Sequence, residues 1–323
     1  MSLKILTSIL VVIMIYFSFC KRINSQEVNK GCFEFYRYAN EGYCSFLSGD
    51  YKQSIIQYEK AFDIKPEGCN VTDYRNDHYL MAKSLIQLKK YDRSKKYLEN
   101  AIFFGGLEWN EMIKDSLSEL VVKTNIITKS KYKELRTNRE SKIDQELYTI
   151  IDSIAYYDQY YRLMAKNLPE SKIDSIRKLQ KIIDFKNEKK IKHLIDSMGY
   201  YPGFNKIGTD KIDLVMMHTS EKFRKQIFST LLKEVDKGNV NPDIIGMMVD
   251  QQNVLNGKRL QKYGYFFEFN EINHKYFMPF ENSNIDSINR YRIEIGAISI
   301  ECAAIKNNAK LPINFDWDYK YKN

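Results

Sequence analysis

The chain has few of the residues from which metal centres and catalytic motifs are commonly built. It has four histidines and five cysteines in 323 residues, with no C-x-x-C pair and no histidine at zinc-finger spacing, so we expect no structural zinc. The motifs H-E-x-x-H, G-x-S-x-G, G-x-x-x-x-G-K-[ST] and G-x-G-x-x-G are also absent. These absences remove the usual sequence support for a metalloprotease, a serine hydrolase, a P-loop enzyme and a dinucleotide-binding enzyme. We predict no metal and no cofactor.

A concentrated block of positive charge is lacking as well. The formal net charge is +9, of which Lys4, Lys21 and Arg22 contribute three, so residues 26–323 carry +6. The lysines are spread among acidic neighbours and do not form one basic block interleaved with aromatic residues, so we expect no nucleic-acid binding. With 44% hydrophobic and 28% charged residues, the composition is that of a globular protein.

The one long apolar run is too short for a comfortable transmembrane helix. It covers Ile5–Phe19, whereas a helix that spans a bilayer needs about 20 residues. The run follows a single positive charge and is typical of a signal peptide, so we predict that residues 1–25 are removed, with cleavage after Ser25 favoured over cleavage after Cys20. The mature protein would then be exported, to the periplasm or outside the cell. The alternative is an uncleaved membrane anchor, because two basic residues follow the run. We expect contact with a membrane only in that case.

Two segments, residues 38–66 and 78–106, share a pattern of small and aromatic residues that suits closely packed pairs of helices. If Tyr51 and Tyr91 are equivalent, the period is 40 residues, which fits a 34-residue repeat with about six extra residues in the connection. The other positions of the pattern are Gly42, Gly49, Tyr58, Ala61 and Pro66 in the first segment, and Ala82, Leu98 and Ala101 in the second. The pattern resembles tetratricopeptide repeats, which implies a surface for another protein or a peptide. Since fewer than about three repeats are rarely stable alone, this module should pack against the rest of the chain or against a partner.

Four cysteines remain after residue 25, and in an exported protein they can form disulfides. A helical hairpin places the start of its first helix beside the end of its second, so we predict a disulfide between Cys32 and Cys69. We expect Cys44 to be a small buried residue within the first helix.

The rest of the chain is also patterned mainly as helices. The predicted parts are a signal peptide (1–25), a tetratricopeptide-like module (26–125), a linker or helix extension (126–142), a helical domain (143–310) and a tail (311–323). Within the helical domain, periodicity predicts separate helices over residues 171–184 and 187–198, and β-rich runs between residues 265 and 278 predict one hairpin. The predicted fold class is therefore mainly α, with tetratricopeptide-like helical hairpins followed by an all-α domain that carries one small β-hairpin.

Some polar residues of the helical domain are unusually placed. Asp158 falls within the apolar stripe of a predicted helix, where an unpaired carboxylate would be costly, and Arg162 one turn later can neutralise it. This pair either fixes helix packing or faces a ligand. His218 suits acid–base chemistry near neutral pH, although a histidine at the end of a short helix can equally cap it. The loop of residues 199–205 contains three aromatic residues, and loops between rigid helices often carry binding groups.

An ordered set of landmarks between residues 143 and 305 resembles a bacterial family that is catalogued only as a domain of unknown function. The landmarks are Asp158-Gln159 with Arg162, Gly199–Pro202, Ile207-Gly208, Val215–His218, Asp250, Gln261–Gly264, Arg292 and Ile295-Gly296. The resemblance implies a shared polar site. Its candidate catalytic residues are His218, Asp158 and Asp250, and its candidate ligand-binding residues are Arg162, Gln261 and Tyr263.

We therefore predict an exported binding protein that holds another protein or a peptide through its helical repeats. One alternative is that the helical domain is an enzyme, with hydrolase-like acid–base chemistry at His218. Another is that this domain binds a small anionic ligand. A buried polar network that only specifies packing would use the same residue types.

Overall fold

The computed structural model describes residues 31–64, 76–114, 126–166, 168–255, 260–269, 275–281 and 284–311. The predicted signal segment, Cys69 and residues 312–323 of the predicted tail lie outside this part of the chain. The described residues are mainly helical and contain one two-stranded antiparallel sheet, which confirms the predicted fold class. Among the described helices, none has both the length and the apolar character needed to cross a bilayer.

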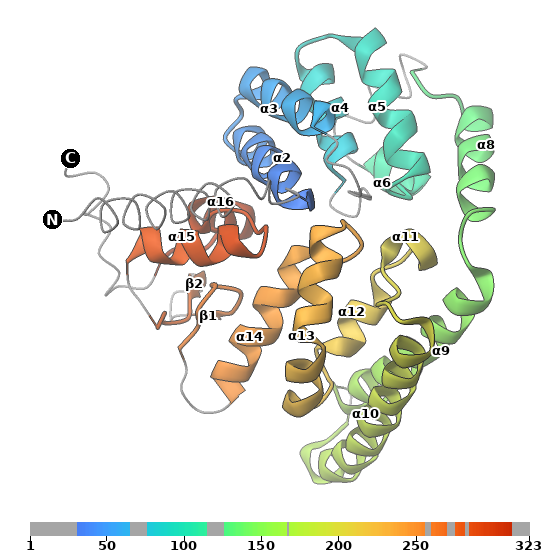
Figure 1. Cartoon of the computed structure of the whole chain (residues 1–323), viewed down its shortest axis with the longest axis vertical. Helices are drawn as coiled ribbons and strands as arrows, with labels where there is room; N and C mark the ends of the chain where they lie inside the picture. The colour runs from blue at the N-terminus through green and yellow to red at the C-terminus, as the bar shows by residue number, and fades with distance from the viewer. Residues whose placement is uncertain are drawn as a thin grey trace, which may run out of the picture.

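The two segments that resemble tetratricopeptide repeats each form a pair of packed helices (Figure 1). The first pair is α2 (Gly31–Leu47) and α3 (Tyr51–Asp63), and the second is α4 (Asp77–Gln87) and α5 (Tyr91–Phe103). Gly49 and Lys89, which are 40 residues apart, both turn the chain with positive φ angles, 81° and 59°. The turn within each pair therefore recurs at the predicted period, although position 89 lacks the glycine that this conformation favours. Membership of the repeat family stays a prediction.

The short helix α6 (Trp109–Lys114) follows α5. The next three helices, α8 (Lys129–Glu140), α9 (Gln145–Lys166) and α10 (Glu170–Met198), run along one side of the molecule (Figure 1). Helix α8 occupies the segment predicted as a linker or helix extension and packs against α5. The prediction of two helices within α10 is wrong. No glycine or proline interrupts the stretch, and buried Asn187 is accommodated because its side chain donates to the backbone O of Ile154 on α9 at 3.4 Å.

Helix α10 is followed by six further helices and the two strands among the described residues. They are α11 (Phe204–Ile207), α12 (Lys211–Met216), α13 (Glu221–Asp236), α14 (Pro242–Leu255), β1 (Phe267–Phe269), β2 (Lys275–Phe277), α15 (Ile285–Glu294) and α16 (Ile300–Asn307). Ser220 caps α13, because its Oγ accepts a hydrogen bond from the backbone N of Phe223 at 3.2 Å. The two strands pair antiparallel, with Glu268 opposite Tyr276.

The last helices return to the first, so the chain closes on itself (Figure 1). Helix α16 lies against α2, and a disulfide joins Cys44 of α2 to Cys302 of α16. The expectation that Cys44 is only a small buried residue is therefore wrong. The sequence around Cys44 and the sequence around Cys302 give no indication that α16 packs on α2, so this disulfide was not predicted. Cys32 is also disulfide-bonded. Its predicted partner, Cys69, lies outside the described residues.

The helical hairpins and the C-terminal helices share a hydrophobic core. One cluster of buried side chains contains Phe35, Tyr58, Met81, Ile151, Leu231 and Ile295. Two buried hydrogen bonds cross the same boundary: the Tyr36 hydroxyl donates to the backbone O of Val235, and Nδ2 of Asn40 donates to the backbone O of Gly296, each at 3.1 Å. The two helical hairpins thus pack against the rest of the chain.

Candidate functional site

His218 and Asp158, which are 60 residues apart in the sequence, are in direct contact. His218 lies in the turn between α12 and α13, and its Nδ1 is 2.8 Å from Oδ2 of Asp158 on α9. The Asp158 side chain is completely buried, whereas 19% of the His218 side chain is exposed. Of the two carboxylates that were predicted to act with His218, Asp158 and Asp250, the imidazole therefore contacts Asp158.

Asp158 belongs to a wider polar network between α9 and α10. Its Oδ2 accepts a hydrogen bond from Nε2 of Gln159 at 2.6 Å and lies 3.5 Å from Nε of Arg162. Arg162 also pairs with Asp184 at 2.6 Å, and Nε2 of Gln180 donates to the same Asp184 oxygen at 2.7 Å. The expected pairing of Asp158 with Arg162 is present, and the network ties the two long helices together.

The turn that carries His218 is held by a buried arginine. Nη1 of Arg224 donates to the backbone O of Met217 at 3.0 Å and to that of Thr219 at 2.9 Å. Burial lowers the pKa of Arg224. The ring of His218 is thus oriented by the turn and by Asp158, with Nε2 on the side away from that carboxylate. An imidazole held in this way can donate or accept a proton.

Asp250 has a different structural role. It lies on α14, is completely buried, and accepts hydrogen bonds from the backbone N of Lys262 (2.7 Å), Tyr263 (3.0 Å) and Tyr265 (3.1 Å). Burial raises the pKa of Asp250 to about 6, although these N–H groups act in the opposite direction. Within the described residues it makes no hydrogen bond to His218. The predicted grouping of Asp250 with His218 is therefore not observed, and Asp250 instead fixes the loop that follows α14.

Gln261 and Tyr263 belong to that same loop. Nε2 of the buried Gln261 donates to the backbone O of Met278 at 2.7 Å, and its Oε1 accepts from the backbone N of Phe266 at 2.9 Å. Arg292 of α15 donates to the backbone O of Tyr263. The polar contacts of Gln261 thus satisfy backbone groups, and of the three predicted ligand-binding residues only Arg162 lies in the His218 network.

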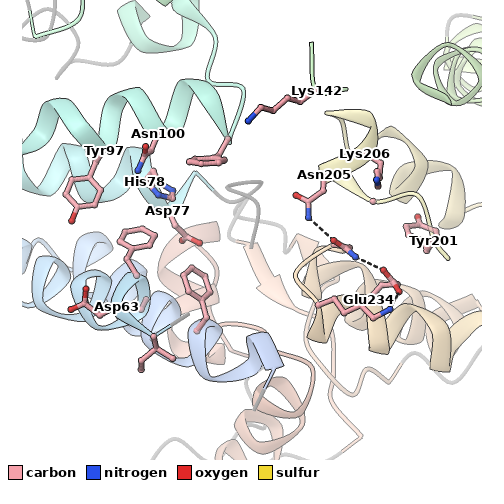
Figure 2. Close-up of a pocket in the computed structure, with 18 of the residues that line it drawn as sticks. Asp63, Asp77, His78, Tyr97, Asn100, Lys142, Tyr201, Asn205, Lys206 and Glu234 are labelled. Carbon is pink, nitrogen blue, oxygen red and sulfur yellow. Dashed lines mark hydrogen bonds and ion pairs between the residues drawn. The ribbon is translucent and has the colours of Figure 1, made fainter. Parts of the chain in front are cut away.

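A cavity of about 900 Å³ lies between the helical hairpins and the C-terminal helices (Figure 2). One wall is formed by α2, α3, α4 and α5, and the other by residues 200–206 and by the end of α13 with the turn after it. His218 and Asp158 do not line this cavity. The structure therefore separates the polar network from this cavity.

The hairpin wall of the cavity is aromatic. The ring of His78 stacks on Phe62 with centroids 4.4 Å apart, and the rings of Tyr97 and Phe104 lie 6.3 Å and 5.9 Å from His78. Phe104 is 44% exposed. Rings of this kind suit the apolar or aromatic groups of a ligand.

The opposite wall is polar (Figure 2). Glu234 of α13 is buried and accepts a hydrogen bond from Nδ2 of Asn239 at 2.6 Å. Nδ2 of Asn205 donates in turn to Oδ1 of Asn239 at 2.7 Å. Gly203 permits this packing, because a Cβ at that position would overlap the backbone O of Asn239. The aromatic loop that the sequence singled out for binding groups contains both Gly203 and Asn205 and lines the cavity.

Tyr201 connects the polar wall to α12. Its side chain is buried, and its hydroxyl donates to Oδ1 of Asp213 at 2.8 Å. Burial raises the pKa of Asp213 to about 7 and also raises the pKa of Tyr201. A carboxyl group that titrates near neutral pH therefore contacts a residue that lines the cavity.

Sequence reasoning missed the hairpin side of the cavity. Aromatic residues at helical spacing are usually core residues, and so His78 and Phe104 gave no functional signal. Their positions at the ends of predicted helices could have indicated that these rings lie close together. Phe62 lies near the end of α3, His78 near the start of α4 and Phe104 directly after α5. Neighbouring antiparallel helices bring such positions together.

Comparisons of the chain with protein-family models, with curated proteins and with solved structures find no match.

Proposed function

We propose that this protein binds a short segment of another protein in the cavity between its helical hairpins and its C-terminal helices. The observation that carries the proposal is the cavity itself, about 900 Å³ in volume, with aromatic rings on one wall and polar side chains on the other. This volume lies near the upper end of the range of about 300–1,000 Å³ that is typical of ligand sites. It suits a short peptide segment better than a folded domain.

The composition of the two walls supports a polypeptide ligand. Partly exposed rings such as that of Phe104 can receive apolar side chains, and such anchors commonly dominate the affinity of protein interfaces. Asparagine side chains on both walls, Asn100 and Asn205, carry the same donor and acceptor groups as a peptide bond. Helical repeats commonly present concave surfaces for extended partners. The predicted export of the chain would place the partner outside the cytoplasm.

Selection of peptides from a random library against the full chain tests this proposal. We expect the enriched peptides to bind about tenfold more weakly to Phe104→Ala, because the variant removes an exposed ring from the cavity wall. The matched control is Phe185→Ala, which removes a ring that is 58% exposed on α10 and outside the cavity, and which should leave binding unchanged. Equal binding to both variants, or no enriched peptide, would contradict the proposal.

A second candidate function is acid–base chemistry at His218, and the observation that favours it is the 2.8 Å contact with Asp158. A carboxylate that orients an imidazole is a common device in hydrolases. The test is hydrolysis of chromogenic ester, amide and phosphoester substrates by the wild-type chain and by His218→Ala. A turnover that His218→Ala abolishes while the chain stays folded would support the enzyme. If the wild type turns over none of these substrates, or if His218→Ala only lowers stability, the pair has a packing role.

A further inference from the structure

Three of the four lysines in the cavity lining are not paired with a carboxylate of another described residue, whereas the fourth, Lys237, pairs with Glu234. Lys96 of α5, Lys142 after α8 and Lys206 of α11 are exposed and come from three separate elements. None of the three forms an ion pair with another described residue. Nζ of Lys142 lies 4.5 Å from the centroid of the Phe103 ring, and Nζ of Lys96 lies 5.9 Å from that of Tyr97. Their charges therefore remain available to a ligand in the cavity.

Two of the three carboxylates in the lining already have partners. Glu234 is paired with Lys237 at 2.7 Å and accepts a hydrogen bond from Asn239. Asp77 is 3% exposed, and its Oδ1 is 3.4 Å from the Tyr58 hydroxyl that donates to it. Asp63 is the one exposed carboxylate in the lining. Four lysines and three carboxylates line the cavity, so the lining carries a small formal excess of positive charge, and three of its lysines have no carboxylate partner among the described residues.

From these observations we infer that the segment bound in the cavity is acidic and carries aromatic side chains. This inference rests on the proposed function and specifies its ligand. The acidic groups of the segment meet Lys96, Lys142 and Lys206, and its aromatic side chains meet the exposed ring of Phe104 and its neighbours. The side chain of Asn100 makes no hydrogen bond within the described residues, so it can pair with a peptide group of the segment.

Single-stranded nucleic acid shares negative charge and stacking rings with such a peptide, but it fits the lining less well. The exposed carboxylate of Asp63 lies in the cavity wall. A phosphate backbone carries a negative charge at every residue and would be repelled by Asp63, whereas a peptide can place a neutral group beside it. An acidic polypeptide is therefore the ligand class that the lining favours.

Fluorescence anisotropy with defined peptides and the full chain tests the inference. The probe is a rhodamine-labelled heptapeptide in which aspartate alternates with phenylalanine or tryptophan. One comparison peptide replaces each aspartate by lysine, a second replaces each aspartate by asparagine, and a third replaces each aromatic residue by serine. We expect each replacement to weaken binding by about tenfold or more, and we expect the affinity of the acidic probe to fall as salt rises.

Two triple variants of equal charge locate the binding. In Lys96→Glu/Lys142→Glu/Lys206→Glu the acidic probe should bind at least about tenfold more weakly. The control is Lys172→Glu/Lys178→Glu/Lys186→Glu, which changes three exposed lysines of α10 outside the cavity and should change the affinity less than about twofold. The peptide comparisons use the wild-type chain, so they remain informative if the first triple variant does not fold.

The outcomes separate this inference from the proposed function. If the asparagine peptide binds as tightly as the acidic probe and Phe104→Ala still weakens it, the acidic class is wrong and the cavity proposal stands. If the serine peptide binds equally well, the aromatic part of the inference is wrong. Binding of an oligothymidylate in place of the acidic probe, lost in the lysine variant, would overturn the inference in favour of nucleic acid. Acidic peptides that bind Phe104→Ala and both triple variants as tightly as the wild type would contradict both proposals.

Discussion

Cys44 of α2 and Cys302 of α16 are joined by a disulfide that spans 258 residues of sequence. Helix α2 supplies Phe35 to the hairpin wall of the cavity, and its Tyr36 and Asn40 bond to backbone groups of the C-terminal half. The disulfide and these two hydrogen bonds all join α2 to the C-terminal half of the chain. The hydrogen bond from Tyr36 to Val235 of α13 joins the two cavity walls directly, whereas the disulfide anchors the hairpin wall to α16.

Removal of this disulfide should lower stability strongly. Cys44→Ser and Cys302→Ser should each reduce the free energy of unfolding by about 2–5 kcal/mol, because the bond restricts a very long loop in the unfolded chain. The double variant should resemble the single variants, since all three lose the same bond. Urea unfolding followed by circular dichroism measures the effect. A double variant that unfolds at the wild-type urea concentration would show that the bond does not stabilise the fold.

Asp213 should make stability fall as the pH rises towards neutral. Its pKa is about 7 in the folded chain and is raised by burial, so the folded state holds a proton that the unfolded state has released between about pH 4 and pH 7. Asp213→Asn removes this cost and can still accept the hydrogen bond from Tyr201. We expect no difference from the wild type near pH 4, and a gain of up to about 4 kcal/mol at pH 8.

Thermal unfolding of the wild type and of Asp213→Asn between pH 4 and pH 8 measures this difference. Asp174→Asn, which removes an exposed carboxylate from α10, controls for the loss of one charge. A difference that is independent of pH would contradict the assignment of the titration to Asp213.

The sequence predicted those features that depend on local patterns. Helical periodicity predicted the mainly α fold, although it divided α10 into two helices. The burial of Asp158 and its pairing with Arg162 also followed from spacing on one helix. The sequence did not show which distant elements meet. The disulfide of Cys44 and the cavity both depend on α2 packing against C-terminal helices, a long-range contact with no local pattern.

The landmarks of the proposed family resemblance divide between two places in the structure. Asp158, Arg162 and His218 come together, whereas Asp250 and Gln261 bind backbone groups of a separate loop. All these residues are polar and near buried helix faces, so sequence spacing does not separate a residue that positions a loop from one that meets a ligand. The partners of Asp250 and Gln261 are backbone groups, and the identity of the residues gives no sign of such partners.

Replacement of Asp250 should lower the stability of the fold without affecting ligand binding in the cavity. Asp250→Ala leaves the N–H groups of Lys262, Tyr263 and Tyr265 without their acceptor and should cost about 2–4 kcal/mol. Asp250→Asn keeps one acceptor oxygen and should cost less. Urea unfolding gives both values, and peptide binding in the cavity should stay within about twofold of the wild type at temperatures where the variants are folded. An Asp250→Ala variant as stable as the wild type would contradict this structural role.

His218 and Asp158 should be energetically coupled. A double-mutant cycle with His218→Gln and Asp158→Asn should give an interaction energy of about 1–3 kcal/mol, because the two side chains share a partly buried hydrogen bond. The same cycle with His218→Gln and Asp174→Asn should give no coupling, since Asp174 is exposed on α10. Free energies of unfolding from urea titrations supply both values. Additive effects of the first pair would show that the contact contributes nothing to stability.

The measurement that tests the central claim most directly is photo-crosslinking of a selected peptide to the chain. A benzoylphenylalanine placed at position 104 lies in the cavity wall, and one placed at position 185 lies on an exposed face of α10. Binding in the cavity predicts a crosslink from position 104 that unlabelled peptide suppresses, and none from position 185. A peptide that binds the chain but crosslinks from neither position, or only from position 185, would place the binding surface elsewhere and contradict the account.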